Sequence, residues 1–188
     1  FTAPNNLGTL EFKLTVYDND YNDSEDFITV NIGTGTAIAD IQCPNDLVQG
    51  TYCYETSTVG ETFTTSGIVT HVKPGEYPNF FLQQPEINAC GGIYVFDFDI
   101  NPNVGDEVTV TGTVNEYYSF TQLIDITSSN INSNVNNNIA PLNISTADLG
   151  IDCSLEGEHL ESMLVKISDA TIESIDDFGN VTVNDGSG

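Results

Sequence analysis

The sequence predicts an all-β protein, and three observations carry this prediction. Thr, Val, Ile, Tyr and Phe recur in short runs, and such β-branched and aromatic residues are typical of strands. Gly, Asn and Asp separate the runs, as turns between strands require. Long runs of Ala, Leu, Glu and Lys, which would favour helices, are missing from the chain. With 188 residues, 39% of them hydrophobic, the chain can bury one sizeable core or two modest ones.

Residues 1–32 are predicted to form a β-hairpin. Apolar and polar residues alternate at period two over 10–16 and again over 27–32, which indicates two strands. The turn between them is densely acidic and carries Asp18, Asp20, Asp23, Glu25 and Asp26. This segment resembles the second half of a PKD-like or cadherin-like sandwich repeat. Because a whole sandwich of this kind needs about seven strands, the resemblance implies a partial β-sandwich.

A second unit is predicted to begin near residue 36. Residues 33–36, with the sequence Gly-Thr-Gly-Thr, form a short flexible joint between the hairpin and the next apolar run. We therefore expect residues 1–36 to be the partial sandwich segment with its joint, and residues 37–188 to be a separate β domain.

The second unit is predicted to contain seven strands and one short helix. The strands are expected at 63–72, 79–83, 92–98, 107–116, 121–126, 163–172 and 181–183, and the helix at 155–160. Residues 128–147 are rich in Ser and Asn, which predicts a polar loop outside the core. The last eight residues, 181–188, are typical of the start of a hairpin whose return strand is missing.

Glycines lie inside three of these predicted strands, at Gly67, Gly92 and Gly112, as a strongly coiled barrel requires. The runs at 65–70, 80–83, 91–96, 104–116, 121–123 and 160–167 resemble, in this order, the OB-fold module that precedes the catalytic domain of secreted bacterial nucleases. The resemblance implies an OB-type β-barrel. The clusters of carboxylates and histidines with which a nuclease domain holds Mg²⁺ have no counterpart in the sequence. We therefore predict that the chain is not an enzyme.

The net charge of the chain excludes one class of partner. Three Lys, no Arg and 28 Asp plus Glu give 3 − 28 = −25 at pH 7. Binding to a nucleic-acid backbone needs a basic surface, and Lys13, Lys73 and Lys166 are too few and too scattered to form one. We expect no direct contact with nucleic acid. The sequence has no long apolar run, so we also expect no membrane insertion. Because the chain begins at Phe1 and not at Met, we expect a processed or excised piece.

Four cysteines, Cys43, Cys53, Cys90 and Cys153, favour two disulfides over free core thiols, and thus an extracellular or cell-surface protein. Three pairings are possible. We favour Cys43 with Cys53, which closes a short loop, and Cys90 with Cys153. Three sequons, at Asn22, Asn143 and Asn180, are candidate N-glycosylation sites.

The acidic turn at 18–26 is a candidate calcium site, because calcium takes six to eight oxygen ligands and alternate carboxylates on a loop can converge on it. The alternative is an ordinary solvated turn. A second acidic stretch, 97–106, is more typical of a plain turn than of a metal site. His71 and His159 stand without a nucleophile motif, so surface or capping roles are expected.

Aromatic residues gather in the alternating pattern of the second unit. They are Tyr94, Phe96, Tyr117, Tyr118 and Phe120. On the face of an OB barrel such rings can stack on sugars or bases. Core packing, with tyrosine tips at an interface, is the stronger interpretation, because the surrounding charge has the wrong sign for a phosphate backbone.

Two functions compete. A half sandwich at one end and a barrel without its final strand at the other would both leave unpaired strand edges, which are templates for another chain. The sequence therefore predicts a non-catalytic extracellular structural module, a protomer or repeat of a surface filament or adhesin, whose copies join head to tail through β-strands. The alternative is an accessory binding module of a secreted nuclease or other hydrolase. Carbohydrate is a further candidate ligand.

Overall fold

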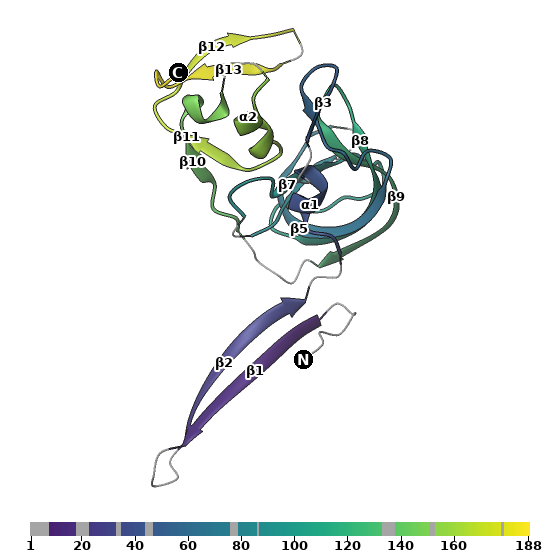
Figure 1. Ribbon diagram of the computed structural model, residues 1–188, viewed down its shortest axis with the longest axis vertical. Helices are drawn as coiled ribbons and strands as arrows, with labels where there is room; N and C mark the ends of the chain where they lie inside the picture. The colour runs from purple at the N-terminus through teal and green to yellow at the C-terminus, as the bar shows by residue number, and fades with distance from the viewer. Residues whose placement is uncertain are drawn as a thin grey trace. The chain divides into compact units, whose positions relative to one another are not determined.

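The computed structural model describes residues 8–17, 23–32, 35–43, 47–75, 79–85, 87–132, 138–150, 153–177 and 179–188. The chain divides into two compact units, Phe1–Gly35 and Thr36–Gly188. Strands dominate both units, so the protein is all-β as the sequence predicts (Figure 1). No helix within the described ranges is both long enough and apolar enough to cross a membrane.

The first unit is a single β-hairpin. Strand β1 (Gly8–Tyr17) pairs antiparallel with β2 (Asp23–Ile32), in a register that runs from Gly8 opposite Ile32 to Tyr17 opposite Asp23. Among the described residues these two strands form a sheet of their own. Leu14 of β1 is 62% exposed.

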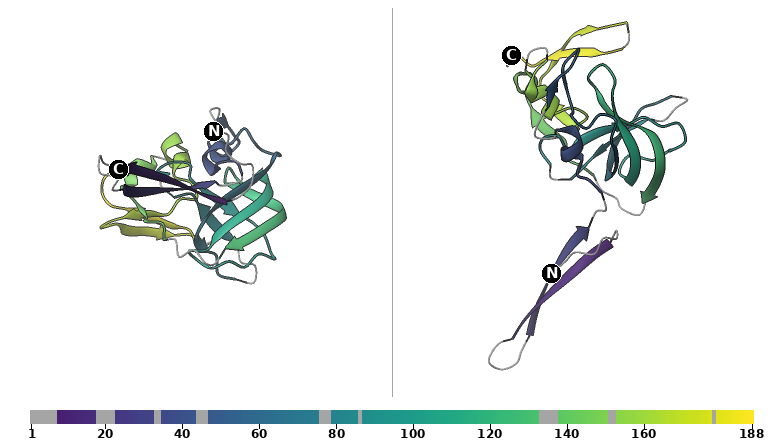
Figure 2. Two further views of the ribbon diagram at one scale, coloured as in Figure 1. Left: turned by 90° about the horizontal axis from the view of Figure 1, so that it is seen from below. Right: turned by 45° about the vertical axis from the view of Figure 1, so that its right-hand side comes forward.

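The second unit is built around a closed five-stranded barrel (Figure 2). Its strands are β5 (Thr62–Val72), β6 (Phe80–Gln83), β7 (Gly92–Val95), β8 (Glu107–Glu116) and β9 (Thr121–Asn132). The order around the barrel is β5-β6-β7-β9-β8, and β8 closes onto β5. All neighbours are antiparallel except β7 and β9, which are parallel. This is an OB-type barrel.

Side-chain alternation along the strands makes the core. In β8, Val108, Val110 and Val114 are buried while the threonines between them are only partly covered, which is the period-two pattern of a strand with one buried face. The buried residues of the barrel meet in one cluster: Ile38, Ile41, Val69, Phe80, Leu82, Ile93, Val95, Ile100, Val108, Val110, Val114 and Leu123. Burial of this apolar surface is the main force that closes the barrel.

Two glycines occur where a side chain would not fit. Gly112 of β8 lies at a shift in register against β9, and an added Cβ would come within 2.5 Å of the Ile126 side chain. Gly92, at the start of β7, faces the backbone of the segment after the barrel, because an added Cβ would lie 2.3 Å from the carbonyl oxygen of Ser162. The glycine positions thus mark a bend and a close backbone approach.

A short helix, α1 (Ile38–Gln42), supplies Ile38 and Ile41 to the core of the barrel and contacts β5 and β7 (Figure 1). This helix was not predicted from the apolar run at its start, because five residues are too few to show a helical period. The hydroxyl of Thr56 donates to the Ile41 carbonyl at 2.6 Å and fixes the end of the helix. A two-residue pair, β3 (Val48–Gln49) and β4 (Tyr54–Glu55), follows.

The chain after the barrel forms a small layer of its own within the second unit. It contains β10 (Leu142–Ile144), the 3-10 helix η1 (Thr146–Leu149), α2 (Leu155–His159), β11 (Val165–Ile167), β12 (Thr171–Ile175) and β13 (Val181–Asn184). Strands β10 and β11 are parallel, and β12 and β13 form an antiparallel hairpin. Asp185 anchors this hairpin, because its carboxylate accepts hydrogen bonds from the hydroxyls of Thr146 and Ser187, both at 2.6 Å.

Three expectations about secondary structure were wrong. The predicted strand 163–172 is two strands, β11 and β12, because Asp169 turns the backbone with a φ of 57°. The predicted loop 128–147 contains the end of β9, which pairs with β8 without needing apolar side chains on an exposed face, and all of β10, which pairs with β11. The final strand is complete, since β13 is itself the return strand of β12.

The cysteines form two disulfides, but not in the favoured pairing. Cys43 pairs with Cys90 and Cys53 with Cys153. From the sequence we favoured a short loop between Cys43 and Cys53. The fold instead places Cys43, directly after α1, beside Cys90, which lies two residues before β7, so the partner is set by packing and not by separation along the chain. No described cysteine is free.

Candidate functional site: an aromatic groove on the barrel

One face of the barrel is hollowed into a groove of about 1070 Å³. Its floor is formed by strands β6, β7 and β9, and its walls by the loops that follow β5, β7 and β8. The strands β6 and β7 and the loops after β5 and β8 correspond to the face and the loops with which OB barrels bind ligands. The lining residues are His71, Lys73, Asn79, Phe81, Tyr94, Phe96, Asp97, Phe98, Asn115, Tyr117, Phe120, Gln122, Ile124, Asp125 and Ile126.

A row of aromatic rings runs along the floor of the groove. The centroids of Phe81 and Tyr94 are 4.9 Å apart, and those of Tyr94 and Phe120 are 5.3 Å apart. His71 extends the row beyond Phe81 at 6.1 Å. Such spacings are those of favourable ring contacts, so the rings hold one another in place. The floor is therefore rigid and apolar.

Exposed aromatic side chains stand at the rim. Phe98 is 52% exposed and packs edge-on against Phe96 at 5.0 Å. Tyr117 is 61% exposed and packs edge-on against Tyr118 at 4.8 Å. Exposed large rings cost hydrophobic free energy unless a ligand covers them, so their grouping around one groove makes this groove the candidate binding surface.

The turn that carries Tyr117 and Phe120 has a costly backbone. Tyr118 and Ser119 both have a φ of 57°, the left-handed conformation that two-residue hairpin turns require and that Asn and Gly adopt more easily. Side-chain bonds hold the turn: the Ser119 hydroxyl accepts from the N–H of Cys53 at 2.9 Å and donates to Glu55 at 3.1 Å. Strained backbone that neighbouring groups hold in place is typical of functional sites.

Three side-chain amides, those of Asn79, Asn115 and Gln122, are among the polar groups of the groove. The Gln122 side chain donates to Asn115 at 2.8 Å, and the Asn79 side chain accepts from the N–H of Asp97 at 3.1 Å. Burial raises the pKa of the Tyr94 hydroxyl, and its hydrogen bond with Asn79 partly offsets this rise. These groups offer directional donors and acceptors between aromatic rings.

The charges in the groove do not suit a phosphate chain. Lys73 is the one lysine of the lining, and Asp97 and Asp125 oppose it. The groove lining, like the whole sequence, therefore carries more acidic than basic side chains. Among the aromatic residues predicted from sequence, Tyr94 is buried as expected, whereas Phe96, Tyr117 and Tyr118 are exposed and not core. Phe81 and Phe98 were not among the residues singled out from sequence, although Phe81 follows the same alternation.

A group of carboxylates lies on the other side of the same hairpin. Glu116 of β8 and Glu161, which follows α2, each accept a hydrogen bond from Thr121. Burial raises the pKa of Glu161 to about 8, and the neighbouring carboxylates of Glu158 and Glu116 add to this rise. Burial likewise raises the pKa of Glu158 to about 7, with a further rise from Glu116, and raises that of Glu116 itself. No sequence pattern joins these residues.

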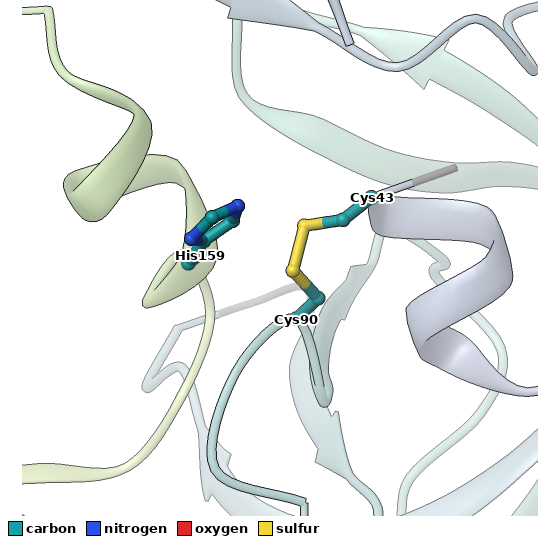
Figure 3. A group of neighbouring side chains, drawn as sticks. All are labelled: Cys43, Cys90 and His159. Carbon is teal, nitrogen blue, oxygen red and sulfur yellow. A yellow bond between two sulfur atoms is a disulfide. The ribbon is translucent and has the colours of Figure 1, made fainter. Parts of the chain in front are cut away.

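One cysteine pair has a histidine beside it. The ring of His159 lies next to the disulfide of Cys43 and Cys90, and all three offer ligand atoms within 4.8 Å of one another (Figure 3). Because the two sulfur atoms are bonded to each other, they have no thiolate with which to bind a metal. The N–H of Cys90 donates to the His159 carbonyl at 2.6 Å, so this histidine also joins α2 to the barrel through its backbone.

The calcium ligands predicted from sequence are only partly within the described residues. Asp18 and Asp20 lie outside them. Asp23, Glu25 and Asp26 belong to β2, for which the structure describes the backbone course. In the second acidic stretch, Asp97 accepts from the N–H of Asp99 at 2.7 Å and of Ile100 at 2.9 Å, which fits the turn interpretation.

The sequons fall in different surroundings. Asn22 lies outside the described residues. Asn143 is exposed in β10, and Asn180 is exposed just before β13. The Asn180 side chain donates to Asp176 at 2.7 Å.

No protein-family description, curated protein or solved structure matches this chain. The barrel and its groove are therefore the features from which we infer the function.

Proposed function

We propose that this chain is a non-catalytic, extracellular binding module whose aromatic groove takes a neutral or weakly charged oligosaccharide. The observation that carries the proposal is the combination of exposed rings and amide side chains on the ligand-binding face of an OB-type barrel. Sugar rings present flat apolar faces and many hydroxyls, and this groove offers a partner for each. The acidic surroundings disfavour nucleic acid. The two disulfides support an oxidising compartment.

The proposal is tested with the intact chain on a panel of neutral and anionic oligosaccharides, with single-stranded DNA as a further probe, followed by calorimetry on any ligand found. We expect Phe98→Ala and Tyr117→Ala each to weaken binding about tenfold, or ~1.4 kcal/mol. Ile175→Ala is the control, because Ile175 is 64% exposed and is not part of the groove lining. Preferential binding of DNA, or equal loss in the Ile175 variant, would contradict the proposal.

A second candidate function is assembly with other copies through the N-terminal hairpin, as in a filament or adhesin. The observation that favours it is that β1 and β2 pair only with each other among the described strands, so each has an outer edge without a described β-strand partner. An isolated two-stranded sheet is marginally stable in water, and a neighbouring chain would complete it. At the other end, β13 is the return strand that the sequence suggested was missing, and β12 and β13 likewise form a two-stranded sheet among the described strands.

Sedimentation and negative-stain microscopy with millimolar calcium test this second function. We expect the intact chain to form head-to-tail filaments and a variant without residues 1–35 to stay monomeric. A monodisperse monomer of the intact chain at micromolar concentration would refute the non-covalent form of this assembly.

A further inference from the structure

Three metal-ligating side chains from distant parts of the chain meet beside the barrel. Cys43 directly follows α1, Cys90 lies in the segment before β7, and His159 is the last residue of α2. Their ligand atoms, two sulfurs and an imidazole nitrogen, all lie within 4.8 Å of one another (Figure 3). Within the described ranges, this is the one group of three or more His, Cys, Asp or Glu side chains close enough together to hold a metal ion.

The backbone holds these residues in place independently of the bond between the sulfurs. The N–H of Cys43 donates to the Ala39 carbonyl at 3.0 Å, which ties Cys43 to α1, and Ile41 anchors that helix in the core of the barrel. The N–H of Cys90 donates to the His159 carbonyl at 2.6 Å. The two sulfurs and the imidazole ring should therefore stay neighbours when the disulfide is opened.

The group is buried at one end and open to solvent at the other. Cys90 is only 6% exposed, whereas His159 is exposed. Cys90 also has a φ of 57°, a left-handed conformation that residues other than Gly, Asn and Asp seldom adopt. Strained backbone that its surroundings hold in place is typical of ligand clamps and switch regions. The exposed side lets a metal ion and a water molecule reach the sulfurs.

Reduction would turn this group into a set of metal ligands. A dithiol reductant supplies two electrons and two protons and is itself oxidised to a disulfide, while the bond between Cys43 and Cys90 breaks and each sulfur becomes a thiol. A divalent metal ion then replaces the two thiol protons, which pass to water. Thiolate and imidazole ligands select zinc, whereas calcium and magnesium prefer oxygen.

The spacing of the group fits a tetrahedral zinc ion. With Zn–S distances of about 2.3 Å and Zn–N distances of about 2.0–2.1 Å, neighbouring ligand atoms of a tetrahedron are about 3.6–3.8 Å apart. Sulfurs that are about 2.05 Å apart in a disulfide would have to separate by less than about 2 Å. The Cα atoms of Cys43 and Cys90 are 5.8 Å apart, which leaves room for this separation. The net charge of −25 also attracts cations to the chain.

We propose that reduction of the Cys43–Cys90 disulfide creates a zinc site formed by Cys43, Cys90 and His159, with water as the fourth ligand. The ion would replace the covalent link between α1 and the segment before β7, and would add α2 to it. It would bind the folded chain and stabilise it by mass action. The barrel and the layer that follows it would thus stay joined in a reducing environment, whatever ligand the groove takes.

Metal titration of the intact chain before and after reduction tests the proposal, with zinc followed by calorimetry and cobalt(II) by its absorption. A water-soluble phosphine, which takes up oxygen from water to become its oxide, is the reductant, because a dithiol would compete for the metal. We expect one ion per reduced chain, with thiolate-to-cobalt charge-transfer absorption, and none per oxidised chain. His159→Ala should weaken the zinc affinity at least tenfold, and His71→Ala, which changes the other histidine of the chain, is the matched control.

Two double variants assign the sulfurs. After reduction, Cys43→Ser with Cys90→Ser should bind no zinc, whereas Cys53→Ser with Cys153→Ser should still bind one ion. Zinc is present during every reduction, and far-ultraviolet circular dichroism verifies that the fold of the oxidised chain is kept. Loss of the fold of the intact chain under these conditions would overturn the proposal, because the ion would then fail to replace the bond.

Four binding results would also overturn the proposal. The first is a reduced, folded chain that binds no ion. The second is equal binding by the oxidised chain, which would assign the ion to surface carboxylates. The third is an unchanged zinc affinity in His159→Ala. The fourth is a site that survives in the variant without Cys43 and Cys90 and is lost in the variant without Cys53 and Cys153.

Discussion

Removal of the Cys53–Cys153 disulfide should strongly destabilise the chain. The perturbation is the double variant Cys53→Ser with Cys153→Ser. Cys53 precedes β4, and Cys153 lies just before α2, so the bond joins segments on either side of the whole barrel. Replacement of both sulfurs by hydroxyls leaves no thiol behind and changes little volume. The loss of stability in this variant therefore reports on the disulfide bond itself.

The expected magnitude follows from the length of the closed loop. Cys53 and Cys153 are 100 positions apart, and a loop of that length restricts the unfolded chain by about 4.7 kcal/mol at 25 °C. For Cys43 and Cys90, 47 positions apart, the same relation gives about 4 kcal/mol. Many domains are stable by only about 5–15 kcal/mol. We thus expect a loss of about 3–5 kcal/mol, a large fraction of the total.

Urea unfolding measures this loss, and thiol titration tests the pairing in the same sample. With the observed pairing, the variant keeps Cys43–Cys90 and shows no free thiol. With the pairing favoured from sequence, Cys43 and Cys90 would each lose their partner, and two thiols would react. An unchanged unfolding midpoint and slope, or two reactive thiols, would refute the reasoning. The variant Cys43→Ser with Cys90→Ser is the matched comparison and should lose slightly less stability.

Three further predictions follow from other parts of the fold. Gly92→Ala should cost about 2 kcal/mol or more in urea unfolding, because its Cβ would press on the Ser162 backbone, which cannot swing aside as a side chain can. In chelator, the contribution of Glu161 to stability should be complete below pH 4.5 and be lost as the pH rises to about 8, because folded Glu161 keeps a proton that the unfolded chain has released. The shift amounts to on the order of 4 kcal/mol, and Glu161→Gln should flatten this part of the profile. A flat or rising wild-type profile would contradict this. Millimolar calcium should raise the melting temperature, and if the acidic turn contributes, Asp20→Ala should lower that rise.

The fold class was predictable because strand patterns are local. Alternation over 107–116 gives the bounds of β8, and glycines inside runs indicate a coiled barrel. The end of β9 was not predictable in the same way. Its Ser and Asn side chains carry no apolar signal, and the strand exists because β8 offers a partner for its backbone, with the Ser128 hydroxyl donating to that of Thr111 at 2.9 Å. Pairing between polar strands leaves little trace in the sequence of either one.

The candidate sites, like the strands, were predictable from the sequence only in part. The aromatic rings of the groove were visible as residue types, but their exposure was not, because alternation alone cannot tell the inside of a barrel from a hollowed outer face. The carboxylate group was invisible, since Gln42, Glu116 and Glu161 belong to no common motif and meet only in the folded chain. The partner of each cysteine was undetermined for the same reason.

The disulfide, the groove and the carboxylates converge on the tip of the β8–β9 hairpin. Cys53 donates its N–H to Ser119, which holds the strained turn that presents Tyr117 and Phe120 to the groove. The next residue pair, Glu116 and Thr121, faces the carboxylate group. The hydrogen bond between Cys53 and Ser119 and the Glu116–Thr121 pair both hold this turn. Loss of either one should therefore free the turn. A rigid turn lowers the entropy that ordering its rings around a ligand would otherwise cost, which explains why the strained conformation is held from both sides.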